Sequence, residues 1–393
     1  MDTERFRNST AGRLIKVGQG EVSYWAFMPN PLPPALLFDA GLVRTLSDAD
    51  RALGELAGLG RAIPNPNLLI GPFIHREAVS SSRIEGTRAD LTDLYAYEAR
   101  QPAFPGLRMS ESETDAHEVL NYVRSMEYGL NRLSTLPISL RLVGELHQRL
   151  MAGVRGEYAT PGEFRRSQNW IGSPGCTLNG ADFIPPPVNE MQEALGMLET
   201  YLHRVNESPP LIRLAFIHYQ FEAIHPFLDG NGRIGRLLLS LLMVNWDLLP
   251  LPLLHLSTYF EKNRSDYYDL LMAVSERGAW HEWVTFFLRG VEERARDAVI
   301  RAKRLQDLHL QWRRQLQAAP RTSALLLKIL DELFKTPIVT APWIQKVLSV
   351  THRSANQSIN RLVAENILRP IPGRIRNRQF AAQGIFDALM ESK

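Results

Sequence analysis

HPFLDGNGRIGR, residues 225–236, is the stretch that decides how this chain folds. Apolar residues at helical spacing flank it on both sides, in LIRLAFIHYQFEAI (211–224) and in LLLSLLMV (237–244). We therefore expect two buried helices joined by a glycine-rich turn. Such a turn directs backbone N–H groups and the positive end of a helix dipole at one point, and that arrangement binds phosphate.

Four side chains in this stretch suit phosphate chemistry. Arg233 and Arg236 are three residues apart, so both can face the same anion. Asp229 precedes the glycines, where a carboxylate could hold Mg²⁺ against phosphate oxygens. His225 is the only group here whose ordinary pKa lies near neutrality, which suits a general base. For a histidine taken alone, a hydrogen-bonded place in the core would be the commoner role.

The run resembles the signature of Fic-domain proteins, H-x-F-x-[DE]-G-N-G-R-x-x-R, and matches it at every specified position. The resemblance implies that AMP is transferred from ATP to a Ser, Thr or Tyr hydroxyl of a target protein, with release of pyrophosphate. It implies that His225 accepts the hydroxyl proton, that ATP is the substrate, and that Mg²⁺ is the metal, held by Asp229. Phe227 would anchor the turn in the core.

The same resemblance distributes the phosphates of ATP along the run. Backbone N–H groups of the glycine turn would cradle them, Arg233 would neutralise the β-phosphate and Arg236 the γ-phosphate. Two tyrosines downstream either line the adenine and ribose pocket or pack in the core, with equal weight. The nucleotide-binding residues implied are Asp229, Gly230, Asn231, Gly232, Arg233, Ile234, Gly235, Arg236, Tyr267 and Tyr268.

Residues 230–235 also satisfy G-x-G-x-x-G, the dinucleotide-binding fingerprint. That motif has to follow a strand within a βαβ unit. The preceding segment instead carries apolar residues at helical spacing, such as Ile217, Phe221 and Ile224. The sequence therefore argues against a dinucleotide-binding fold.

An upstream motif resembles the inhibitory motif of the Fic family, [ST]-x-x-x-E-[GN]. It is formed by Ser81, Glu85 and Gly86. The resemblance implies that Glu85 pairs with Arg236 and keeps it from the γ-phosphate of ATP. Without the resemblance, Glu85 would be read as a solvated side chain at a helix end capped by Gly86.

A segment rich in Gly and Pro, residues 162–188, resembles the flap of Fic proteins, a β-hairpin in that family. A flap edge can pair with an extended target segment through backbone hydrogen bonds. An ordinary surface loop is the alternative. The flap residues singled out are Gly180, Ala181, Asp182 and Phe183.

The remaining sequence predicts an all-α protein with one hairpin, the flap, as its main β feature. We expect an irregular, Pro-rich opening, a short helix around Leu53–Leu59, a helix over residues 68–87 and a long charged helix over residues 291–317. The predicted domains are 1–109, helical with the inhibitory motif; 110–318, the Fic core; and 319–393, a compact C-terminal module.

Composition narrows the setting of the protein. A formal charge of +3 is too mild to imply that the whole chain binds nucleic acid. The one cysteine, Cys176, allows no internal disulfide, so we expect a reducing, cytoplasmic location. The charged start MDTERFRNST lacks the apolar core of a signal peptide, and no apolar run reaches membrane-spanning length.

The C-terminal module resembles a winged helix-turn-helix, with three predicted helices followed by a basic hairpin. Residues 351–380 carry a net charge of +5, so the module could bind DNA. Protein contact or homodimer formation is the alternative. Two other functions stay open: a DNA-binding regulator whose core senses nucleotide, and a hydrolase that removes AMP. The target protein, which could be the chain itself, is not readable from the sequence.

Overall fold

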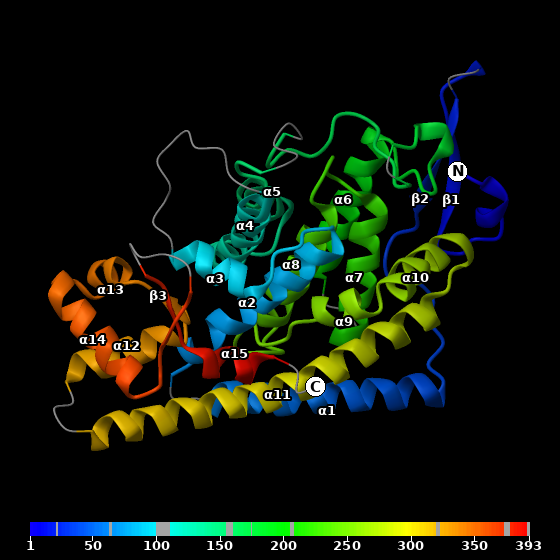
Figure 1. The fold of residues 1–393 in the computed structure, drawn as a ribbon. Coiled ribbons are helices and arrows are strands. Elements are labelled where there is room, and N and C mark those ends of the chain that lie inside the picture. The colour runs from blue at the N-terminus through cyan, green and yellow to red at the C-terminus, as the bar shows by residue number, and fades with distance from the viewer. Residues whose placement is uncertain are drawn as a thin grey trace.

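The computed structural model describes residues 1–20, 23–62, 65–99, 111–154, 160–173, 175–204, 208–319, 323–372 and 378–390. The described part is mainly helical, as expected, with short antiparallel strand pairs (Figure 1). Within these ranges, every helix is too short or too polar to cross a membrane.

Two buried helices flank the HPFLDGNGRIGR turn: α7 (Pro210–Ile224) and α8 (Asn231–Asn245). Most side chains of both helices are buried, so they form the centre of the fold. Around them pack α4 (Glu111–Arg132), α5 (Leu140–Leu150) and α6 (Val188–His203). The apolar spacing around the turn therefore predicted these two helices correctly.

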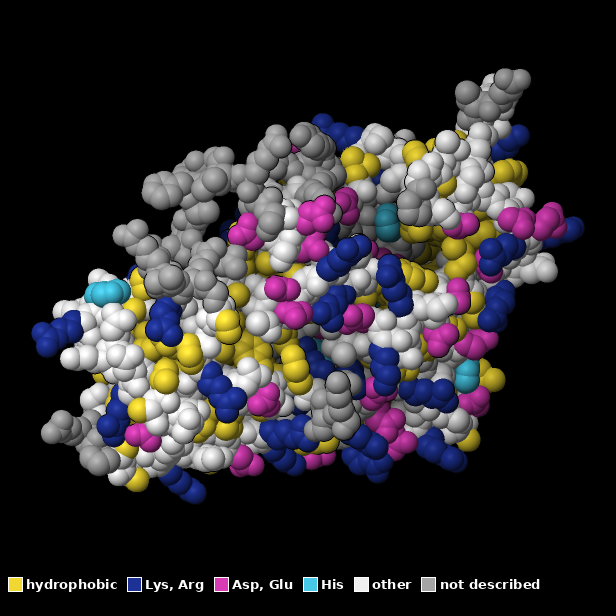
Figure 2. Space-filling view, in the orientation of Figure 1, with side chains coloured by type: hydrophobic (Ala, Val, Ile, Leu, Met, Phe, Trp, Pro, Cys, Tyr) yellow, Lys and Arg dark blue, Asp and Glu magenta, His cyan; other side chains and the backbone are white. Residues whose placement is uncertain are grey.

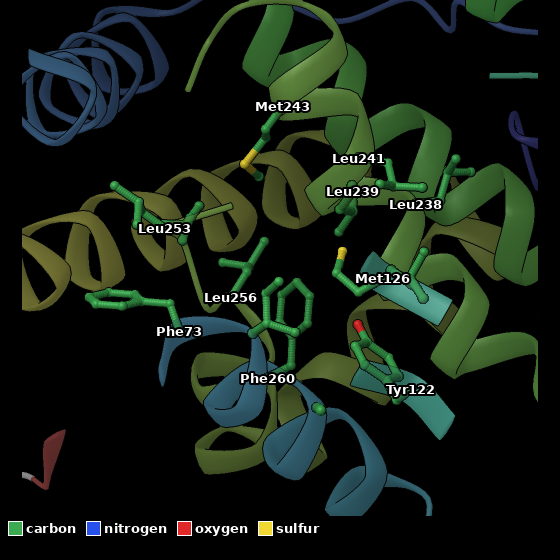
Figure 3. Packing of buried hydrophobic residues seen from close by; sticks show 14 of the residues in the cluster. Phe73, Tyr122, Met126, Leu238, Leu239, Leu241, Met243, Leu253, Leu256 and Phe260 are labelled. Carbon is green, nitrogen blue, oxygen red and sulfur yellow. The ribbon is translucent and has the colours of Figure 1, made fainter. Parts of the chain in front are cut away.

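The helix α2 (Asn67–Ile84), predicted over residues 68–87, packs against α4, α8 and α9 (Ser257–Lys262). Figure 3 shows their side chains meeting in one core, with Phe73 of α2, Met126 of α4, Leu239 of α8 and Phe260 of α9. This packing brings the end of α2 to the start of α8. Two further helices pack nearby: α3 (Leu91–Ala99) against α2 and α4, and α10 (Arg264–Arg277) against α9 and α11 (Trp280–Ala318).

Two long helices, α1 (Ala40–Ala62) and α11 (Trp280–Ala318), lie side by side along one edge of the molecule (Figure 1). The helix expected around Leu53–Leu59 is present as part of α1, but it is longer than predicted because it begins at Ala40 and continues through Gly60. The charged helix expected over residues 291–317 is part of α11. On the face shown in Figure 2, basic and acidic side chains are interspersed over this edge, in keeping with the small net charge.

The Pro-rich stretch of the opening is irregular over residues 30–39, as expected, but the residues before it form a strand pair that the sequence did not predict. After a 3₁₀ turn (Thr3–Phe6), strands β1 (Gly12–Val17) and β2 (Tyr24–Pro29) form an antiparallel hairpin, with register from Gly12↔Pro29 to Val17↔Tyr24. Burial of Ala26, Phe27 and Met28 stabilises it. This hairpin, and not the flap, is the longest strand pair in the described residues.

The C-terminal module contains α12 (Ala324–Leu333), α13 (Ala341–Leu348), α14 (His352–Ala364) and α15 (Gln383–Leu389). Its short strands β3 (Ile338–Val339), β4 (Arg369–Pro370) and β5 (Phe380–Ala381) are ordered β3-β5-β4. The tip of the expected basic hairpin, residues 373–377, lies outside the described residues. The winged-helix assignment stays a prediction.

Candidate active site

The turn between α7 and α8 is held by its own asparagine. The backbone N–H of Phe227 donates to Asn231 Oδ1, and Asn231 Nδ2 donates to the Phe227 carbonyl, both at 2.8 Å. Gly230 has φ 79°, a left-handed conformation that glycine adopts without strain, and precedes the first residue of α8. The asparagine of the signature therefore fixes the loop, and the glycine allows the sharp entry into the helix.

His225 ends α7 in a left-handed conformation, with φ 49°. Its Nδ1–H donates to the carbonyl of Glu222 at 3.2 Å, which leaves Nε2 as the unprotonated nitrogen. Burial lowers the pKa of His225 to about 4. The imidazole is therefore neutral near pH 7, and Nε2 can accept a proton.

Two residues of the flap segment and one of α5 support this turn, a role that the sequence did not indicate. Arg165, which is 1% exposed, donates from Nε to the His225 carbonyl at 3.0 Å. Asn169 Nδ2 donates to the Phe227 carbonyl at 2.8 Å. The ring of His147 stacks on Phe227, with centroids 3.7 Å apart. Nothing in the sequence marks these residues for this role, since Arg165 and Asn169 read as part of the Gly- and Pro-rich segment and His147 lies in α5 outside any motif.

The end of α2 reaches the start of α8 through Arg236. Its Nε donates to Ser81 Oγ and its Nη2 to the Ser81 carbonyl, both at 2.9 Å, and Nη2 lies 2.6 Å from Glu85 Oε1. Burial opposes ionisation, but Arg236 holds the pKa of Glu85 below its ordinary value, and Glu85 raises the pKa of Arg236. Gly86 ends the segment at φ 104°, where a side chain would be strained.

Glu85 also covers the entrance to α8. A Cβ on Gly232 would overlap Glu85 Oε1 and lie 2.8 Å from Arg236 Nη1. The carboxylate therefore occupies the helix N-terminus, the place where the sequence predicts phosphate. An ATP phosphate and Glu85 would compete for the same position.

The two arginines of the signature lie in different surroundings. Arg236 lines the cleft described below, whereas Arg233 does not. Arg233 is 4% exposed, with nitrogens 3.5 Å from Glu118 Oε2 and 3.6 Å from Asp229 Oδ1. From their spacing we expected both arginines to face the same anion, but in this structure only Arg236 lines the cleft.

Asp229 is the one acidic side chain within the turn itself. Its side chain is 49% exposed, and Oδ1 accepts the backbone N–H of Gly230 at 2.5 Å. Among the described residues there is no group of three or more His, Cys, Asp or Glu that could hold a metal ion. Mg²⁺ commonly uses only one or two carboxylates together with substrate phosphates and water, so Asp229 fits that donor set.

A cleft of about 640 Å³ joins these groups. Its phosphate end contains Glu85, His225, Gly232 and Arg236. Of the flap residues, Asp182 and Phe183 line it, together with Trp170 and Ile171; Gly180 and Ala181 do not. The other lining residues are Arg5, Gly172, Tyr219, Glu222, Ala223, Tyr267, Tyr268, Asp269, Leu271, Met272 and Ser275.

The flap is less regular than expected. In the described part of this segment, pairing is one antiparallel bridge, Ile171↔Phe183, with the N–H of Ile171 bonded to the Phe183 carbonyl at 2.8 Å. The N–H of Phe27 in β2 donates to the Ile184 carbonyl at 2.8 Å. The N-terminal hairpin therefore supports the flap, a contact that the sequence did not predict.

The two tyrosines differ in exposure. Tyr267 is 1% exposed, stacks on Phe260 at 4.5 Å and bonds through its hydroxyl to His218 Nε2 at 2.8 Å. Tyr268 is 42% exposed. Most of the contacts of Tyr267 are therefore core-packing contacts, and Tyr268 is the more exposed of the two tyrosines that line the cleft. His218, given no role from the sequence, serves as a hydrogen-bonded core residue.

Comparisons with known proteins agree on one family. Residues 43–131 match the Fic/DOC family N-terminal model and residues 137–243 the Fic/DOC family model. Over 196 residues, 49% of this chain, it is 28% identical to the protein adenylyltransferase Fic of Drosophila persimilis and 29% identical to that of Drosophila mojavensis. The chain covers only 34% and 35% of those two relatives.

Among solved structures, a Fic family protein from Desulfovibrio desulfuricans G20 has a TM-score of 0.56 to this chain at 20% identity. The match covers 89% of this chain and 98% of that one. At this identity the likeness establishes a shared fold.

Proposed function

We propose, from the premise that this chain is a Fic-domain protein, that it transfers AMP from ATP to a Ser, Thr or Tyr hydroxyl of a target protein. The relatives named protein adenylyltransferase support this reaction class. The observation that carries the proposal is the cleft in which a neutral His225 and a buried Arg236 face the same space at the start of α8.

In this reaction the target hydroxyl oxygen attacks the α-phosphorus of ATP. A new oxygen–phosphorus bond forms, the bond to the β-phosphate oxygen breaks, and pyrophosphate leaves in line. Nε2 of His225 takes the hydroxyl proton, because Nδ1 already donates to Glu222. Backbone N–H groups of Gly230, Asn231 and Gly232 bind phosphate oxygens, and Arg236 binds the γ-phosphate.

Two residues of the turn have auxiliary roles in the proposal. Asp229 would hold Mg²⁺, which neutralises phosphate charge when bound. Arg233, which lies beside Asp229 and Glu118, would contribute positive charge on the β-phosphate side. The proposed catalytic role stays with His225 alone.

The resting protein is proposed to be inhibited by Glu85. Its carboxylate occupies both Arg236 and the space over Gly232, so the γ-phosphate cannot reach its binding groups. ATP bound without that anchor would have its α-phosphate misplaced for in-line attack.

Incubation with α-labelled ATP and cell lysate tests the function. Wild type, Glu85→Gly and Glu85→Gly/His225→Ala are compared for labelled protein bands, including the chain itself. We expect strong labelling by Glu85→Gly, weak labelling by wild type and none by the double variant. Absence of label with all three would refute AMP transfer.

The remaining parts of the proposal concern the whole chain. Residues 1–109, 110–318 and 319–393 are proposed as the inhibitory, catalytic and winged-helix-like domains. Exposed Arg353, Arg369 and Arg378 support nucleic-acid contact by the last of these, and a gel shift with duplex DNA tests it. Cytoplasmic location and homodimer formation stay predictions from the sequence.

A further inference from the structure

Glu222 carries an unexplained polar atom in the cleft. Its Oε1 is buried and has no hydrogen-bond partner among the described residues, although the side chain lines the cleft with His225 and Arg236. Leaving a buried acceptor unpaired costs free energy, and buried polar atoms of native proteins nearly always have a protein, water or ligand partner. The cleft therefore has a place for a hydrogen-bond donor at Glu222.

Two helices fix the position of this carboxyl group. Glu222 lies on the last turn of α7, three residues before His225, whose Nδ1 donates to the Glu222 carbonyl at 3.2 Å, and both residues line the cleft. On the α8 side, a Cβ on Gly235 would lie 2.5 Å from Glu222 Oε1. The absence of a side chain at position 235 therefore leaves room for the carboxyl in this position.

The chemistry of ATP limits which group can pair with this carboxylate. Phosphate oxygens only accept hydrogen bonds, so the donors of ATP are the two ribose hydroxyls and the adenine amino group. Because His225 serves the α-phosphate, and ribose is bonded to that phosphate, the ribose lies closer than the far edge of the base. Acidic side chains bind ribose hydroxyls in this way in dinucleotide-binding folds.

We propose that Glu222 accepts hydrogen bonds from the ribose hydroxyls of the nucleotide and thereby makes the cleft selective for ribonucleotides; this rests on the nucleotide site of the proposed function. The contact is separate from the signature run, which binds phosphates. The contact would give the unpaired Oε1 of Glu222 a hydrogen-bond donor and would place the ribose next to Glu222 in the cleft.

Calorimetric titration at pH 8 with ATP and with 2′,3′-dideoxy-ATP tests the proposal. Both ligands are titrated into full-length Glu85→Gly protein and into the same protein with Glu222→Ala. We expect the parent to bind dideoxy-ATP about tenfold or more weakly than ATP, the usual loss for a hydrogen bond to a charged group. Glu222→Ala should bind the two ligands equally. Glu292→Gln changes a partly exposed carboxylate of α11 that pairs with Arg296 and does not line the cleft, and it should keep the parent's preference.

Two further variants protect the test against misfolding. Glu222→Gln keeps the shape of the side chain and should show a reduced preference for ATP over dideoxy-ATP. It serves as the test if thermal melting shows that the alanine variant does not fold. Gly235→Ala should reduce the preference by displacing the carboxyl group.

Equal binding of ATP and dideoxy-ATP by the parent overturns ribose recognition and leaves AMP transfer standing. Binding of neither nucleotide overturns both. Inosine triphosphate identifies the other donor: if Glu222→Ala removes discrimination between ATP and inosine triphosphate instead, the partner is the adenine amine and the ribose assignment is wrong.

Discussion

Glu85 and Arg236, 151 residues apart in the chain, form a partly buried ion pair of 2.6 Å across the start of α8. Arg236 is also bonded to Ser81 by both Nε and Nη2, so three contacts tie the arginine to α2. Because Arg236 is 2% exposed, loss of Glu85 would leave a buried charge that an incoming phosphate could satisfy.

Glu85→Gly should therefore raise AMP transfer. A charge-assisted contact is worth about 1.5–3 kcal/mol, so its loss should raise the population of molecules with Arg236 free for phosphate by roughly ten- to a hundredfold. The initial rate of label transfer from α-labelled ATP measures it. Glu85→Gln, which keeps the size but loses the charge, should give an intermediate rate. Adding Arg236→Ala should cancel the gain; an active double variant would show that the ion pair is not the inhibitory contact.

His225→Ala, made in the Glu85→Gly protein, should abolish AMP transfer while changing the Kd for ATP less than about threefold. The reason is that Nε2 faces the target hydroxyl, whereas phosphate is bound by the turn and Arg236. General bases contribute typically 10²- to 10⁴-fold in rate. His281→Ala, a half-buried histidine of α11 that does not line the cleft, is the matched control. Retained transfer with His225→Ala would exclude it as the base.

Asn231→Ala should slow AMP transfer although the Asn231 side chain is not proposed to contact the substrate. The side chain makes two hydrogen bonds of 2.8 Å to the backbone of Phe227, and both would be lost. Each is worth about 0.5–1.5 kcal/mol, so we expect a fall of about 1–3 kcal/mol in the free energy of unfolding. A loosened turn should also cost roughly tenfold or more in kcat. Unchanged stability and kcat would mean that the turn holds its shape without Asn231.

The sequence predicted the parts of the fold in which local pattern and tertiary role agree. The spacing of Leu214, Ile217 and Phe221 marked α7 as buried, and the Fic resemblance paired Glu85 with Arg236, a contact that the structure contains. The fully matched signature run carried most of this information.

The missed parts depend on contacts between distant segments. The β1–β2 hairpin was hidden because its stabilising partners, such as Ile184 against Phe27, lie in the flap. Arg165 reads as a loop residue, yet three-dimensional packing buries it against the His225 carbonyl. Glu222 sits in an apolar helical pattern, and nothing in that pattern reveals an unpaired oxygen.

The pH dependence of AMP transfer should report the low pKa of His225. Burial lowers that pKa to about 4 from its ordinary value near 6.5, and the base works only when neutral. In Glu85→Gly/Glu222→Gln, which lacks the carboxyl whose pKa burial raises to about 7, the rate should stay level from pH 8 to about 5.5 and fall only below pH 5. A midpoint near 6.5 would show that His225 titrates as an exposed histidine.

Asp297 should stabilise the junction of α2, α11 and the C-terminal module. Its carboxylate accepts from His255 at 3.0 Å and from Arg301 Nε at 2.6 Å, and lies 3.6 Å from Arg76. Both arginines also donate to the carbonyl of Leu389, at the end of α15. One carboxylate thus balances the charges that fasten the end of the chain to the helix carrying the inhibitory motif.

Although burial opposes it, hydrogen bonds from His255 and Arg301 hold the pKa of Asp297 well below its ordinary value. A carboxyl whose pKa is lower in the folded state contributes stability above its unfolded pKa of about 3.9, and that contribution is lost as the pH falls further. Asp297→Asn should lower the free energy of unfolding at pH 7 by about 2–4 kcal/mol, because it leaves buried guanidinium groups without their partner.

Urea unfolding at pH 7 and pH 3 measures both effects. The variant's deficit should shrink at pH 3, whereas the control Glu292→Gln, which breaks one partly exposed ion pair, should change stability by less than about 1 kcal/mol at pH 7. An equal deficit for Asp297→Asn at the two pH values would mean that packing, and not the charge of Asp297, stabilises this junction.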